Sequence, residues 1–126
     1  YQHQKSKFMI TILIYLSFFV MTLFISRDCF AANRFEIAHL NIEEQDMIII
    51  PLDGSFGRKS SSQQKQAHVA LQFCASSAGL KGNVVLVWEE DDMFYFIAPK
   101  PWHSFFKEVT MEWVELQINK ELTCGN

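Results

Sequence analysis

The segment from Asp53 to Ser60 contains residue types that could bind an anion. A glycine-containing loop between a strand and a helix start offers backbone N–H groups to a negative ligand, and Arg58 and Lys59 add positive charge. The spacing is not that of a P-loop. Two residues separate Gly54 from Gly57 where that motif has four, and an arginine stands between the second glycine and the lysine. The segment therefore indicates either an anion-binding loop or an ordinary turn before a well-capped helix.

A second group of candidate residues follows two prolines, in the segment from Lys100 to Phe106. Trp102 and His103 could stack on a sugar ring or anchor a partner protein, because a large rigid aromatic ring contributes much contact area. The alternative is that these rings fill the core of a small domain. We expect Phe105 and Phe106 to be core residues, and we keep Trp102 and His103 as candidate contacts together with Arg58, Lys59 and Ser60.

Catalytic and metal-binding signatures are weak throughout the chain. His39, His68 and His103 are far apart in sequence, and the sequence contains no HxxxH, HExxH or CxxC pair that would announce a zinc site. A Ser–His–Asp arrangement could be assembled from Ser55, His103 and Asp53, but the G-x-S-x-G elbow is absent. We therefore predict no catalytic residue, no metal and no cofactor. The acidic run from Glu89 to Asp92 lacks calcium-loop spacing and is typical of a solvated hairpin tip.

An apolar run from Phe8 to Ile25 predicts where the rest of the chain works. Lys5 and Lys7 precede the run, and small residues follow it, so residues 1–31 are typical of a secretory signal cleaved after Ala31. The alternative is an uncleaved N-terminal anchor, since a run of eighteen uncharged, mainly apolar residues approaches the ~20 that span a bilayer. In both cases the positive-inside rule places residues 32–126 outside the cytoplasm, in a periplasm or secreted.

Cleavage would leave two of the three cysteines, Cys74 and Cys124. An even pair in an oxidising compartment predicts a disulfide, here closing a loop of about fifty residues. The alternative is a free Cys74 on a helix and a free Cys124 near the C-terminus. We favour the disulfide because the chain is predicted to be exported.

Charge restricts the class of partner. Loss of Lys5, Lys7, Arg27 and Asp28 with a cleaved segment would shift the formal charge from −3 to −5. An acidic domain is poorly suited to nucleic acid, whose binding depends on neutralising phosphates with Lys and Arg. No repeat or linker divides residues 32–126, so we expect a single small domain.

The first half of that domain reads as two strands and a helix. Residues 34–40 alternate in polarity, residues 47–50 form a short β-branched run, and the polar residues between them indicate a turn. Ser60 to Ser62, with Gln63 or Gln64 three positions later, are typical of a capping box. Small and apolar residues then recur at helical spacing up to a stop at Gly79.

The second half reads as a hairpin followed by an ambiguous stretch. Residues 84–88 and 93–98 are rich in strand formers on either side of the acidic tip. We expect a short helix over residues 101–107. Apolar residues in the stretch beyond fit a helical stripe, but strict alternation favours a long strand from about 111 to 123. The expected fold is α+β, with one amphipathic helix on an antiparallel sheet of four to five strands.

Two functional hypotheses follow from these observations. The favoured one is a small exported binding module with a protein partner in the envelope, for example an accessory, inhibitory or immunity-type protein. Membrane contact is expected only if residues 8–25 are retained. The alternative is a small hydrolase or anion-ligand enzyme built from Asp53, Arg58 and His103.

Overall fold

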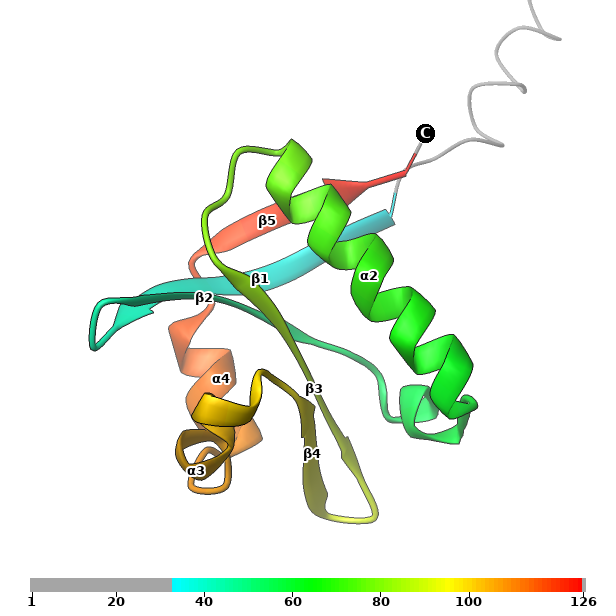
Figure 1. Ribbon diagram of the computed structural model, residues 1–126. Helices are drawn as coiled ribbons and strands as arrows, with labels where there is room; N and C mark the ends of the chain where they lie inside the picture. The colour runs from blue at the N-terminus through cyan, green and yellow to red at the C-terminus, as the bar shows by residue number, and fades with distance from the viewer. Residues whose placement is uncertain (1–32, 126) are drawn as a thin grey trace, which may run out of the picture. The chain divides into compact units, whose positions relative to one another are not determined.

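A computed structural model describes residues 33–125, and it confirms the predicted α+β fold. The predicted signal segment, residues 1–31, and the apolar run 8–25 lie outside the described residues. Five strands form one sheet in the order β4-β3-β2-β1-β5 (Figure 1). The strands are β1 (Asn33–Ile42), β2 (Gln45–Pro51), β3 (Asn83–Glu90), β4 (Met93–Ile97) and β5 (Lys120–Cys124).

The sheet is mixed, whereas the sequence predicted a purely antiparallel one. Strands β1 and β2 form a hairpin, and β3 and β4 form another. Both hairpins turn on two acidic residues with positive φ, Glu43–Glu44 and Asp91–Asp92, as two-residue hairpin loops require. β2 and β3 run parallel, because α2 (Ser61–Ser77) carries the chain back between them.

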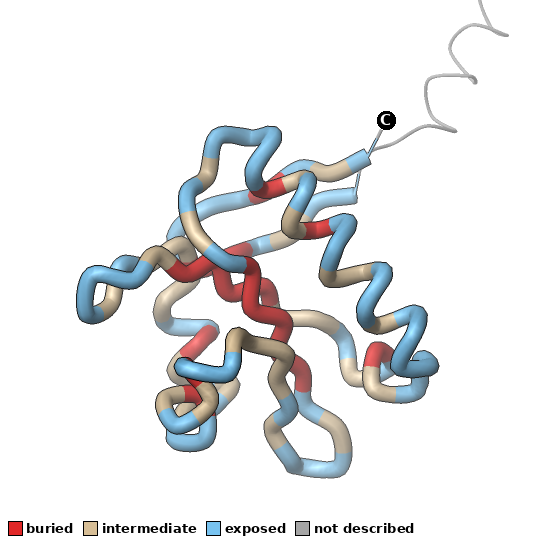
Figure 2. The backbone as a smooth tube through the Cα atoms, in the orientation of Figure 1, coloured by how far each residue is buried: buried red, intermediate tan, exposed pale blue. Residues whose placement is uncertain are grey.

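Alternation along the strands divides the core into two layers. Side chains such as Ile37, Ile48 and Leu86 pack on the face covered by α2. Their neighbours, such as Ala38, Ile49 and Val85, pack on the opposite face, which is covered by η2 (Lys100–Trp102), α3 (His103–Phe106) and α4 (Met111–Gln117). The inner strand β3, which lies between β4 and β2, is buried over most of its length, as Figure 2 shows. Helices on both faces explain why its sequence is continuously apolar.

Helix α2 begins and ends where the sequence predicts. The Ser60 hydroxyl accepts a hydrogen bond from the Gln63 backbone N–H at 3.1 Å, and the Gln63 side chain accepts one from the Ser60 N–H at 3.1 Å. These two bonds form the predicted capping box. Gly79 follows the helix with a φ of +84°, a conformation in which a side chain would be strained.

The predicted long strand over residues 111–123 is wrong. Residues 111–117 form α4, and only Lys120–Cys124 form a strand. The Thr110 hydroxyl caps α4 by accepting a hydrogen bond from the Trp113 N–H. The alternation was misleading because Leu116, one of its apolar positions, faces solvent. The short helix expected over residues 101–107 is confirmed as η2 and α3.

The predicted disulfide is present and joins α2 to β5. Cys74 and Cys124 are bonded, with their Cα atoms 5.8 Å apart. Asn33, the first residue of β1, pairs with Cys124. The bridge therefore fixes α2 over the edge of the sheet where the described chain begins and ends.

Candidate functional site: an exposed face of helix α2

The predicted anion-binding segment folds mainly as a helix cap. Gly54–Arg58 form a short 3-10 turn, η1, whose Phe56 is buried in the core layer between α2 and the sheet. The capping box uses Ser60 and Gln63 to bond each other's backbone N–H groups, and the Gln64 side chain donates to the Phe56 carbonyl. Arg58 and Lys59 remain exposed. The predicted capping box is confirmed, whereas anion binding by Arg58 and Lys59 stays a prediction.

Trp102 and His103 occupy the opposite layer of the molecule. Trp102 is only 8% exposed and belongs to the core under α3 and α4, so it is not the exposed platform that the sequence suggested. His103 is half-buried, and its Nε2 donates to the Ala98 carbonyl at 2.9 Å. Phe106 is fully buried, as expected, whereas Phe105 is only half-buried.

The structure does not bring the residues of the hypothetical hydrolase together. The Asp53–Arg58 segment lies on the side of the sheet that α2 covers, anchored by Phe56, and His103 lies on the opposite side beside Phe96 and Ala98. The Ser55 hydroxyl donates to the Asp53 carboxylate at 3.0 Å, an ordinary loop contact. Direct acid–base contact needs groups within about 3 Å of each other, which opposite faces of a sheet do not offer.

All three histidines of the described part of the chain hold backbone carbonyls. His68 Nε2 donates to the Val84 carbonyl, His103 Nε2 to that of Ala98, and His39 Nε2 to that of Lys81. Each imidazole ring thus uses one nitrogen for a hydrogen bond to the backbone. Within residues 33–125, no group of three or more His, Cys, Asp or Glu residues could hold a metal ion.

Sequence reasoning missed one polar cluster, around His39. The Asn119 side chain bonds both the N–H and the C=O of His39, and Lys120 Nζ donates to His39 Nδ1 at 2.9 Å. Both ring nitrogens are therefore engaged, which leaves no lone pair for a substrate proton. The cluster joins the β1 and β5 strands to the loop after α2, and its function is structural.

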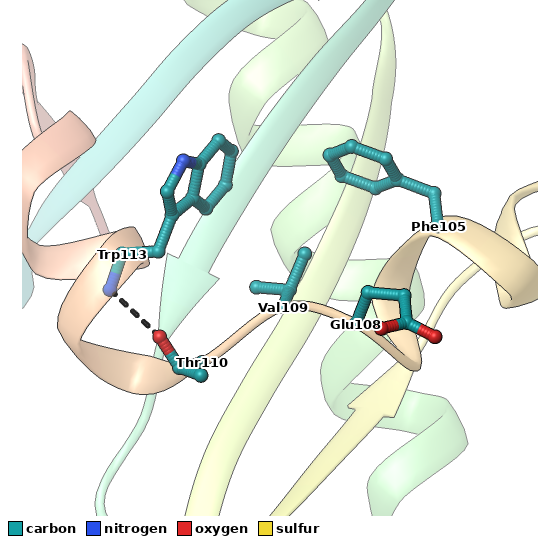
Figure 3. Close-up of a pocket in the computed structure, with 5 residues that line it drawn as sticks. All are labelled: Phe105, Glu108, Val109, Thr110 and Trp113. Atoms are coloured by element: carbon teal, nitrogen blue, oxygen red, sulfur yellow. Dashed lines mark hydrogen bonds between the residues drawn. The ribbon is translucent and has the colours of Figure 1, made fainter.

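A hollow of about 340 Å³ lies between α3 and α4. Figure 3 shows the rings of Phe105 and Trp113 on its two sides and Val109 between them. The two rings meet edge to face, with centroids 5.9 Å apart. Glu108 and Thr110 add the polar atoms. The hollow is apolar with one carboxylate at its border, and it contains no paired acid and base.

The outer face of α2 is the more unusual surface. Phe73 is 75% exposed and Val69, one turn earlier, is 61% exposed. A second hollow of about 390 Å³ surrounds Val69, lined by Ser62, Lys65, Gln66, Val69 and Ala70. Lys65 is the only Asp, Glu, Lys or Arg in the seventeen residues of α2. We call this surface, made of Ser62, Gln66, Val69, Ala70 and Phe73, the α2 face.

The disulfide explains why Phe73 points to solvent. Leu71 and Ala75 are buried against the sheet, and Cys74 must also face inward to reach Cys124. Each helical residue is rotated by about 100° from the last, so Phe73 lies about 160° away from both Leu71 and Ala75. The bridge and the small inward residues therefore fix a rotation of α2 that leaves its largest side chain outside.

Scans of the chain against protein-family models, curated proteins and solved structures return no match. Within residues 33–125, no helix combines the length and the apolar character needed to cross a membrane.

Proposed function

We propose that the chain is an exported binding module that recognises a partner protein through the α2 face. The observation that carries the proposal is the exposure of Phe73 together with Val69 on a helix with a single charged side chain. Aromatic anchors and a lack of charge are the features that distinguish the centre of a protein interface. Export is supported by the signal-like residues 1–31 and is compatible with the Cys74–Cys124 disulfide.

The spacing of the α2 face indicates what kind of partner fits. Ser62, Gln66, Val69 and Phe73 follow one another at intervals of four, three and four residues, which places them on one stripe of the helix. Helices recognised in this way lay such a stripe into an apolar groove of the partner. The stripe itself carries no charge, and Lys65 lines the hollow beside it, so the matching groove should be mainly apolar. The partner is therefore a protein with an apolar groove, in the envelope or outside the cell.

The test uses a photo-crosslinking residue placed at Phe73 in the full chain, expressed in cells that export it. Leu116 is the matched control, because it is 82% exposed but lies on α4, on the other side of the sheet. We expect a discrete protein adduct from position 73 and none from position 116. The captured protein is then purified and titrated with the wild type and with Phe73→Ala, which should weaken binding by about thirtyfold if Phe73 is a central anchor.

Three outcomes would contradict the proposal. Equal adducts from both positions would mean that the α2 face is not selective, and unchanged affinity of Phe73→Ala would remove its anchor. Adducts with lipid alone, together with sedimentation of the wild type but not of Phe73→Ala with phospholipid vesicles, would make the surface a membrane contact. Phe73 is largely exposed, so its replacement by Ala should leave the fold intact, which circular dichroism would verify.

A further inference from the structure

In the part of the chain that the structure describes, strand β4 leaves one edge of the sheet open. It is the outermost strand, and its five residues, Met93 to Ile97, include no charge, no proline and no glycine. Edge strands of this kind readily pair with another strand, and proteins usually protect them with charges, prolines or bulges. Met93 and Tyr95 are also exposed, by 60% and 38%. The edge is thus apolar as well as unpaired.

The backbone groups that face outward follow from the hairpin. The turn Asp91–Asp92 has two residues, so the flanking Glu90 and Met93 form a hydrogen-bonded pair, and bonding alternates from there. Met93, Tyr95 and Ile97 therefore bond β3, whereas the N–H and C=O groups of Phe94 and Phe96 point away from it. Within residues 33–125, those outward groups make no backbone hydrogen bond beyond the sheet.

We infer that β4 pairs antiparallel with β4 of a second copy, about a two-fold axis at Tyr95. In this register Phe94 of one copy bonds Phe96 of the other, so the four outward backbone groups of each copy are all satisfied. On the α2 side of the sheet, Tyr95 faces its own equivalent and Met93 faces Ile97. On the other side, Phe94 faces Phe96. Aromatic and aliphatic cross-strand pairs of this kind stabilise sheets.

The charges at the two ends of β4 favour antiparallel over parallel pairing of the two copies. The tip of the hairpin is acidic (Glu89, Glu90, Asp91 and Asp92), and the other end of β4 is followed by Lys100. Antiparallel pairing about Tyr95 brings the acidic tip of each copy to the Lys100 end of its partner, at both ends of the ladder. Parallel pairing would instead place the two acidic tips together. A two-fold axis is also the commonest symmetry of protein dimers.

The dimer is expected to be weak and to leave the α2 face free. A ladder of one short strand buries less surface than a standard stable interface, so dissociation in the micromolar range is expected. The two α2 helices would lie on the same side of a continuous ten-stranded sheet. Two copies of the proposed binding surface would then be presented together. The inference does not depend on the proposed function, because it rests on a different strand.

Cysteine scanning tests the register directly. In the full chain carrying Cys29→Ser, Tyr95→Cys should form an intermolecular disulfide under mild oxidation, because Cα atoms of facing residues in this type of pair are about 4.5 Å apart. Met93→Cys is the control, since it is more exposed than Tyr95 but lies four residues from its equivalent in the partner. Equal cross-linking at positions 93 and 95, or none at 95, would overturn the register.

Charge complementation tests the second copy itself. Tyr95→Lys or Tyr95→Glu alone would place like charges opposite each other on the axis, and each should raise the dissociation constant at least about tenfold in sedimentation equilibrium. An equimolar mixture of the two variants should recover dimer. The inference fails if the wild type remains monomeric up to about 1 mM, or if mixing recovers nothing. Circular dichroism and an intact Cys74–Cys124 bridge would verify that each variant is folded.

Discussion

The two outer strands of the sheet differ in how well they are protected from pairing with other chains. Strand β5 carries Lys120 and Glu121, and Glu121 lies 3.9 Å from Arg34 of the neighbouring strand. Its last residue, Cys124, is bonded to α2. Strand β4 has none of these features and exposes apolar side chains. Charges and a disulfide protect the β5 edge from pairing with another chain, whereas the β4 edge remains able to pair.

The largest effect on the free energy of unfolding should come from removing the disulfide between β5 and α2. Replacing Cys74 and Cys124 by Ser reopens a fifty-residue loop in the unfolded chain. The free energy of unfolding, measured in urea, should fall by about 4 kcal/mol. Reduced wild-type protein is the control and should unfold at a similar urea concentration. A loss below about 1 kcal/mol would show that β5 is held by its ladder and packing alone.

This prediction began in the sequence, and so did most of the α2 side of the molecule. The cysteine pair, the Ser60 cap and the Gly79 stop are local or compositional signals, and the structure confirms them. The parallel pairing of β2 with β3 was missed, although a helix between two strands favours it. That feature depends on the path of the connection and not on any residue within the strands.

The candidate site was harder to predict, because exposure is decided by tertiary packing. Trp102 is of a residue type common at contact sites but fills the core, whereas Phe73, which the sequence did not single out, is largely exposed. The rotation of α2 depends on where Cys74 meets β5, which the helical period alone does not give. Likewise, α4 replaced a predicted strand because Thr110 caps it and Val114 faces the core while Leu116 does not.

A smaller effect on stability is expected from changing Gln72, a side chain of α2 that takes the place of a neighbouring strand at the start of β3. Strand β4 pairs with β3 only from Leu86 onward, so the start of β3 is a second open edge. The Gln72 side chain closes it by donating to the Gly82 carbonyl and accepting from the Val84 N–H, at 3.1 and 2.8 Å. This bonding imitates the ladder of a neighbouring strand.

Gln72→Ala should therefore lower the free energy of unfolding by about 1–3 kcal/mol, because it leaves two partly buried backbone groups without partners. Gln66→Ala is the matched control, since Gln66 is an exposed glutamine of the same helix, and should change stability by less than about 0.5 kcal/mol. Hydrogen exchange of the Val84 amide should increase in the first variant only. Equal destabilisation by both variants would indicate a general effect on α2 and would contradict the edge-closing role.

The smallest effect on the free energy of unfolding should come from removing the Arg34–Glu121 ion pair at the β5 edge. The Arg34 and Glu121 side chains are both mostly exposed and 3.9 Å apart, so water screens their attraction. Glu121→Ala should lower the free energy of unfolding by about 0.5 kcal/mol or less, and the difference should disappear in about 1 M salt. The measurement is urea unfolding at low and high salt, with Glu115→Ala on α4 as the control. If the main role of Glu121 is to prevent β5 from pairing with another chain, its replacement should increase self-association more than it reduces stability. A β5 edge without that charge should then associate more like β4, and no change in association would show that Lys120 and the disulfide protect it sufficiently.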